Sequence, residues 1–88
     1  MSKTVTIINE TGIHTRPGSV IVKKAKEFKE DGTQIMLSYN GKEAKADSLV
    51  KILSLGIKKD AEVIVSAEGP SAEKAVEEMA ELLSTLVD

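Results

Sequence analysis

The residues best suited to chemistry in this 88-residue sequence lie together near its start, in the stretch Thr11-Gly12-Ile13-His14-Thr15-Arg16-Pro17. His14 is the only histidine, and Pro17 favours the first turn of a helix, where its missing N–H costs nothing. A helix N-terminus carries roughly half a positive charge and unpaired N–H donors, so it favours an anion such as phosphate. Arg16 adds a planar guanidinium that suits phosphate oxygens. The stretch therefore combines a histidine with the components of a phosphate site.

The charges around His14 indicate what its imidazole could do. The helix dipole and Arg16 both disfavour the imidazolium, and a neutral imidazole is a nucleophile suited to attack on phosphorus. The residues alone leave two interpretations open: an ordinary solvated loop histidine, and a histidine that is itself phosphorylated. We expect no metal site, because one histidine and no cysteine cannot supply the usual ligand sets. General acid–base catalysis needs a substrate pocket, for which so small a chain has little room.

The hydrophobic pattern predicts one small α+β domain over residues 1–88, with the order β-α-β-β-α-β-α and all helices on one face of a single sheet. The strongest local signal is Asn40-Gly41, which is typical of a two-residue hairpin turn. The expected strands cover residues 4–8, 34–39, 42–46 and 62–66, and the expected helices cover 17–30, 48–55 and a last segment opened by Pro70-Ser71. Ile8, Met36 and Ile64 are expected on the less covered face of the sheet.

Composition excludes several functional classes. A net charge of −2 and 2% aromatic residues argue against direct nucleic-acid binding. No apolar run approaches the roughly 18 residues needed to span a bilayer, so we expect no membrane insertion and a cytoplasmic location. We expect neither a cofactor nor a metal in this chain.

Two helical faces are candidates for partner contact. On the first helix, Val20, Lys23, Lys24 and Glu27 should lie opposite the core stripe, with Lys26 on the flank. The short helix carries five apolar residues within seven positions, of which Ile52 and Leu55 should face inward; the other three, at least partly exposed, are Leu49, Val50 and Leu53. A solvated lysine face and simple core packing are the respective alternatives.

The chain resembles the HPr family, the histidine-containing phosphocarriers of the bacterial sugar phosphotransferase system. The motif Gly12-Ile13-His14-Thr15-Arg16-Pro17 looks like the family's phosphorylation site. Three further matches follow in the family's order along almost the whole chain: Asn40-Gly41-Lys42, the stretch from Ser48 to Gly56, and Ser66-Ala67-Glu68-Gly69.

The resemblance implies an open-faced β-sandwich, in which three helices cover one side of a four-stranded antiparallel sheet. It implies that His14 accepts a phosphoryl group on Nδ1 from enzyme I, a magnesium-dependent enzyme, and passes it to the A components of sugar permeases. Arg16 and the amides of Thr15 and Arg16 would hold the phosphate, while Pro17 fixes the helix start. The chain would be a stoichiometric carrier, not an enzyme, and is expected to be monomeric. The partner-docking residues would be Val20, Lys23, Lys26, Leu49, Val50, Lys51 and Leu53.

Ser48 matches the serine that HPr kinase/phosphorylase modifies in many Gram-positive bacteria, where the phosphate blocks histidine phosphorylation and promotes binding to a catabolite-control repressor. Serine is also simply a good helix N-cap, worth about 1 kcal/mol. Two neighbours depart from the regulated pattern: Asp47 stands where lysine is common, and Lys51 where glycine is frequent. Gly18 replaces the usual alanine and should loosen the first helix by up to about 1 kcal/mol.

Two alternative functions remain open from sequence. One is a regulatory paralogue that acts through Ser48 and protein–protein binding, against which the presence of His14 counts. The other is a carrier in a nitrogen-related phosphoryl chain.

Overall fold

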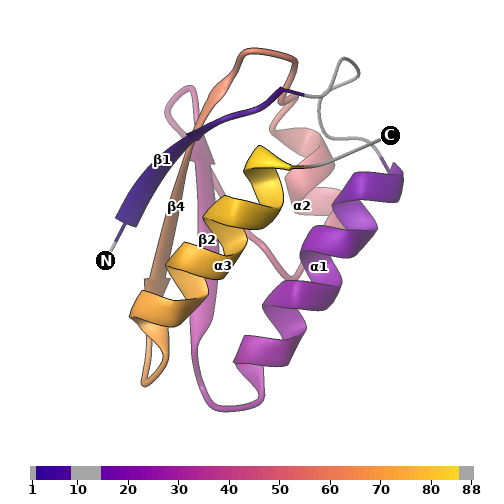
Figure 1. Cartoon of the computed structure of the whole chain (residues 1–88). Coiled ribbons are helices and arrows are strands. Elements are labelled where there is room, and N and C mark those ends of the chain that lie inside the picture. Colours follow the sequence, from indigo (N-terminus) through magenta and orange to yellow (C-terminus); the bar gives the residue numbers. More distant parts are fainter. Residues whose placement is uncertain (1, 9–14, 86–88) are drawn as a thin grey trace.

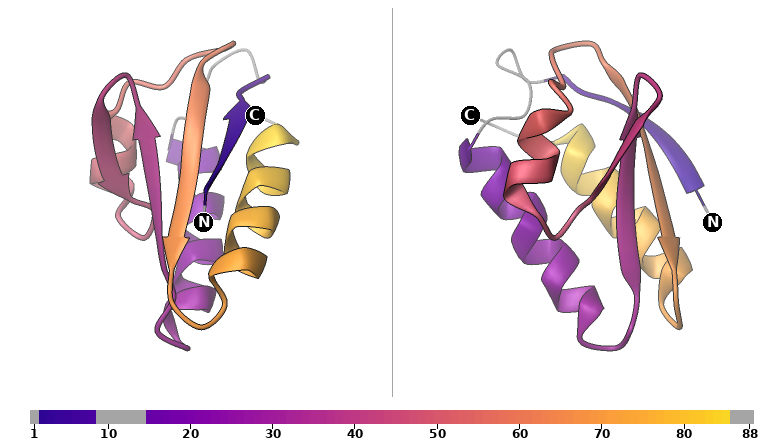
Figure 2. Two further views of the ribbon diagram at one scale, coloured as in Figure 1. Left: turned by 90° about the vertical axis from the view of Figure 1, so that its left-hand side faces the viewer. Right: turned by 180° about the vertical axis from the view of Figure 1, so that it is seen from behind.

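The structure, a computed structural model, describes residues 2–8 and 15–85, with the backbone alone for Thr15 and Arg16 (Figure 1). Its elements are β1 (Ser2–Thr6), α1 (Thr15–Lys29), β2 (Gln34–Tyr39), β3 (Lys42–Lys45), α2 (Leu49–Ser54), β4 (Glu62–Glu68) and α3 (Ala72–Ser84). The strands form one antiparallel sheet in the order β1-β4-β2-β3. All three helices lie on the same side of it, which confirms the expected open-faced sandwich (Figures 1 and 2).

The core lies between the sheet and the helices and follows from alternation along the strands. In β4, Val63, Val65 and Ala67 are buried, because a strand turns successive side chains to opposite faces. The helices meet them with buried residues at helical spacing; these are Ile21, Ala25 and Phe28 of α1, Ile52 of α2, and Val76, Met79 and Leu83 of α3. On the face that the helices leave open, Ile64 is 45% exposed and Met36 is half-buried, as predicted, whereas Ile8, 57% exposed, lies beyond the end of β1.

Several element boundaries differ from the sequence-based expectation by one or two residues: β3 ends at Lys45, β4 continues to Glu68 and α2 spans only Leu49–Ser54. Two of the shifts lie in the N-terminal part of the chain. The first strand begins and ends two residues earlier than predicted. Ile7 still donates its amide to Ala61 O at 2.9 Å, but its carbonyl accepts from Asp60, whose positive φ of 69° ends the regular ladder. Helix α1 begins at Thr15, two residues before Pro17. The proline costs no hydrogen bond there, since the first four amides of a helix have no intrahelical partner.

The predicted hairpin is present. Asn40 and Gly41 have φ values of 52° and 80°, which a two-residue turn of the favoured twist requires at both positions. Tyr39 pairs with Lys42 across this turn, so the turn also fixes the register between β2 and β3.

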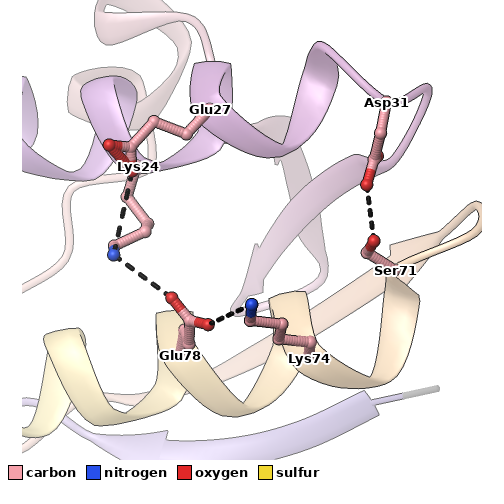
Figure 3. A network of polar contacts seen from close by, with 6 residues as sticks. All are labelled: Lys24, Glu27, Asp31, Ser71, Lys74 and Glu78. Carbon is pink, nitrogen blue, oxygen red and sulfur yellow. Dashed lines mark hydrogen bonds and ion pairs between the residues drawn. The ribbon is translucent and has the colours of Figure 1, made fainter.

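A polar cluster that no local sequence pattern predicts joins the α1–β2 connection to the start of α3. Asp31 Oδ1 accepts from the Thr33 amide at 3.0 Å and from Thr33 Oγ1 at 2.6 Å, and Asp31 Oδ2 accepts from the Ser71 hydroxyl (Figure 3). Thr33 Oγ1 in turn accepts from the Ser71 amide at 3.0 Å. These hydrogen bonds, that of Ser71 foremost, lower the pKa of Asp31. Gly69 lies against this cluster, since a Cβ there would be 2.6 Å from Thr33 Cα.

We expect Gly69→Ala to lower the free energy of unfolding by about 3 kcal/mol, because φ is 131° and the new Cβ meets backbone atoms. Gly41→Ala is the matched control: its φ is also positive, but nothing lies within 4 Å, so about 1 kcal/mol is expected. Urea unfolding of both variants measures the difference. Equal losses would show that close packing at Gly69 contributes nothing.

Candidate functional site

The N-terminus of α1 follows directly after His14, which itself lies outside the described residues. Thr15, Arg16 and Pro17 occupy the first three helical positions, and the first turn contains no acidic residue. No carboxylate of that turn therefore offsets the positive end of the helix dipole. Pro17 and Gly18 are buried, which holds this end of the helix against the protein body. The backbone at Thr15 and Arg16 thus lies where the unpaired amides of a helix N-terminus favour an anion, and phosphate binding by these residues stays a prediction.

Helix α2 lies beside the N-terminal half of α1 and contacts it (Figures 1 and 2). Its inward residues are Ile52 and Leu55, which are 0% and 6% exposed. Val50 is 77% and Leu53 37% exposed, while Leu49 is half-buried. The predicted division of this helix into core and surface positions is confirmed. A two-turn helix cannot turn five apolar residues toward one core, so part of its apolar surface remains in contact with solvent.

The lysines predicted to lie on the outer sides of α1 and α2 differ in their exposure and in their ion pairs. Lys23, Lys26 and Lys51 are exposed, and none of them is in an ion pair with another described residue. Together with Val20, which is 46% exposed, they give the two helices an apolar surface with unpaired positive charges.

The placement predicted for Lys24, opposite the core, is wrong. Its side chain is only 31% exposed and its Nζ lies 3.3 Å from Glu78 Oε1 on α3 (Figure 3). Glu27 Oε2, on α1 itself, lies 3.8 Å from the same Lys24 Nζ. Within α3, Lys74 Nζ lies 3.8 Å from Glu78 Oε2. Lys24 therefore points into the seam between α1 and α3, a direction set by the third helix and not by the periodicity of α1 alone.

Ser48 is the N-cap of α2, where the sequence allowed either Asp47 or Ser48. Its carbonyl accepts from the Ile52 amide at 3.0 Å, and its Oγ accepts from the Lys51 amide at 3.5 Å, the long limit for a hydrogen bond. Its backbone is extended, with φ −120°, as an N-cap requires. The residue is half-exposed. The regulatory role of its hydroxyl stays a prediction.

Asp47, directly before Ser48, forms an ion pair with a residue distant in the sequence, which no local pattern predicts. Its Oδ2 lies 2.7 Å from Lys29 Nζ, and its side chain is 9% exposed against 59% for the lysine. The hydrogen bond from Lys29 lowers the pKa of Asp47. The pair connects the C-terminal end of α1 to the start of α2, over 18 residues of sequence.

Within residues 2–8 and 15–85, no group of three or more potential metal-ligating side chains is found. The helices described there are all too short or too polar to cross a membrane.

Comparison with known proteins identifies the family. The family model described as "PTS HPr component phosphorylation site" matches residues 1–85. The chain belongs to the HPr family. The phosphocarrier protein HPr of Vibrio cholerae serotype O1 is 46% identical over 84 residues, covering 96% of this chain and 95% of that one. The phosphocarrier protein HPr of Buchnera aphidicola subsp. Schizaphis graminum is 45% identical over 75 residues, covering 85% of each.

Solved structures of the HPr family agree with this fold. The phosphocarrier protein HPr of Bacillus anthracis str. Ames superposes with a TM-score of 0.86 at 29% identity, covering 94% of this chain and 95% of that chain. The HPr-C-His structure from Thermoanaerobacter tengcongensis gives a TM-score of 0.86 at 34% identity, covering 94% and 90%. The resemblance to the HPr family that the sequence motifs indicate is therefore confirmed.

Within this HPr-family fold, Lys29→Met should raise the pKa of Asp47 toward its ordinary value of 3.8. A lowered folded-state pKa gives stability that is present above the unfolded pKa and lost as pH falls through the folded value. The stability advantage of the unmodified chain over the variant should thus be present at pH 7 and shrink on acidification below about pH 4. Carboxyl NMR titration and urea unfolding measure both effects. Lys26→Met, which removes an exposed lysine without an ion pair, is the control and should leave the titration of Asp47 unchanged.

Proposed function

We propose that this chain carries phosphoryl groups in the sugar phosphotransferase system, taking them on His14 from phosphorylated enzyme I and giving them to the A components of sugar permeases. The observation that carries the proposal is the match to the HPr phosphorylation-site family over residues 1–85, a span that includes His14. The start of α1 directly after His14, with no acidic residue in its first turn, supports it independently.

The chemistry follows from these positions. The neutral imidazole of His14 attacks the phosphorus with the lone pair of Nδ1, while the bond between phosphorus and enzyme I breaks and its electron pair stays with enzyme I. The amides of Thr15 and Arg16 and the Arg16 guanidinium hold the dianion, and Pro17 fixes the helix start. The reverse transfer to a permease component regenerates the imidazole. The chain is a stoichiometric carrier in this scheme, needs no cofactor or metal of its own, and works as one domain over residues 1–88.

The surface that we propose for docking consists of Val20, Lys23, Lys26, Leu49, Val50, Lys51 and Leu53. The exposed apolar side chains of α2 and the unpaired lysines of α1 and α2 support it. Lysines around an apolar contact steer partners of negative potential and leave the energy of binding to the apolar centre. One small surface of this kind can serve enzyme I and several acceptors in turn.

Regulation through Ser48, by a kinase of the HPr kinase/phosphorylase type with a catabolite-control repressor as reader, is the second candidate. A phosphate at the N-cap of α2 would be favoured by the helix dipole and would add about −2 charge to the docking surface. Asp47 opposes it as a neighbouring carboxylate, although Lys29 partly neutralises that charge. A carrier in a nitrogen-related chain would have the same His14 chemistry and differ only in its partners.

The first test is intact mass after incubation with phosphoenolpyruvate, magnesium and a catalytic amount of enzyme I. We expect one added phosphoryl group, lost in acid as expected for a phosphohistidine, and none on His14→Ala. Ser48→Ala is the control and should gain the group normally. No adduct, with an enzyme I that phosphorylates another HPr, would contradict the proposal. Repressor binding that depends on Ser48 and survives in His14→Ala would then favour the regulator.

A second test concerns the docking surface. Val50→Glu should raise the KM of enzyme I for this chain about tenfold, because it places a charge at the centre of an apolar contact. Ile64→Glu makes the same kind of change on the open face of the sheet, where Ile64 is 45% exposed, and should leave the KM unchanged. If both variants behave alike, α2 does not form the contact.

A further inference from the structure

Strand β1 is an outer strand of the sheet and lies between β4 and α3 (Figure 2). Four of its five residues are exposed; only Val5 is buried. The position is apart from the proposed docking surface, because α2 packs on β3, at the opposite edge of the sheet. Residues of β1 have no part in the phosphoryl-transfer scheme.

The pairing with β4 shows which backbone groups of β1 are unused. Ile7 donates to Ala61 O, and antiparallel ladders bond every second residue to the same neighbour. The amides of Lys3 and Val5 therefore point to β4, while the amides and carbonyls of Thr4 and Thr6 point away from the sheet. No hydrogen bond among the described residues engages these outward groups. Such an edge can accept one further strand.

Beside this edge runs a groove of about 590 Å³ between β1 and α3. Thr4 and Thr6 line it on the strand side, and Glu77, Ala80 and Glu81 on the helix side. An extended segment paired with β1 would point every second side chain into this groove, since successive side chains alternate. On the helix side, the groove is lined by the small apolar side chain of Ala80 and by the carboxylates of Glu77 and Glu81.

The charge of the groove selects the occupant. Glu77 and Glu81 are one helical turn apart and exposed, and neither is in an ion pair with a described residue. Lys3 is the one cation among the lining residues, so the groove has a net charge of −1. A second copy joined edge to edge about a two-fold axis would bring two such acidic rows together, which repels. A segment with lysine or arginine at alternate positions would instead pair with them.

We propose that the outer edge of β1 and the groove against α3 bind an extended basic peptide segment of a partner protein by strand addition. Main-chain hydrogen bonds to Thr4 and Thr6 hold the segment, and Glu77 and Glu81 select its basic side chains. The site is separate from the phosphoryl-transfer surface, so one chain could hold this partner while it exchanges phosphoryl groups.

The experiment uses the full chain, labelled with ¹⁵N, and a capped heptapeptide of alternating lysine and valine. We expect saturable amide shifts confined to residues 2–6 and 77–84. The double variant Glu77→Gln/Glu81→Gln should weaken binding at least tenfold. Glu62→Gln/Glu73→Gln is the matched control; it removes two exposed carboxylates that do not line the groove and should leave the affinity unchanged.

Two further arms separate strand addition from simple charge attraction. The same peptide with methylated backbone nitrogens at alternate residues keeps its charge but loses donors, and should not bind. Thr4→Pro should also weaken binding, because it removes an outward amide and leaves the ladder to β4 intact. Equal binding of the methylated peptide, equal loss in the control variant, or no shifts at millimolar peptide would overturn the proposal. Concentration-dependent self-association through β1 in place of peptide binding would overturn it too.

Discussion

The structure depends on the burial of β4 on one face only. This strand pairs with β1 on one side and β2 on the other, and its alternate residues Val63, Val65 and Ala67 form the centre of the core. A chain of this length can build one such layer and no second, so the helices must all pack on that face. The surfaces left to solvent are then the outer sides of the helices, the helix ends, the edges of the sheet and its uncovered face, where Ile64 is 45% exposed.

The helices use their outer surfaces differently, and the difference is one of charge. Lys23, Lys26 and Lys51 have no carboxylate within ion-pair distance among the described residues, whereas Lys24 is bound to Glu78 in the seam with α3 and Lys29 to Asp47 at the other end of α1. Unpaired charges keep their full effect on an approaching partner, while paired ones cancel at a distance. The pairing of Lys24 thus removes one positive charge from the surface and places it where it connects two helices. Net charge alone, which is −2, would not reveal a positive surface.

The sequence was sufficient for elements whose signals are local. Asn40-Gly41 specifies its turn by the φ values it tolerates, and the spacing of Ile52 and Leu55 gives the inner side of α2. It was insufficient where partners come from distant parts of the chain. Asp31, Thr33 and Ser71 meet across 40 residues, and Ser71, expected only to open α3, gives its hydroxyl to Asp31. The start of α1 was placed late because Pro17 suits several positions of a first turn.

The environment of Ser48 shows how far the neighbouring Asp47 would oppose a phosphate on this serine. An aspartate directly before a phosphorylated serine would be repelled by it, yet Asp47 is nearly buried and held by Lys29 at 2.7 Å. The pair leaves little net charge beside Ser48, so the repulsion that the sequence suggests is reduced by a residue 18 positions earlier. The Ser48 hydroxyl accepts a hydrogen bond from the Lys51 amide only at the long distance of 3.5 Å. A phosphate oxygen carries more negative charge than a hydroxyl oxygen and would strengthen this hydrogen bond. The local structure therefore accommodates a phosphate at Ser48 better than the charge of Asp47 alone would indicate.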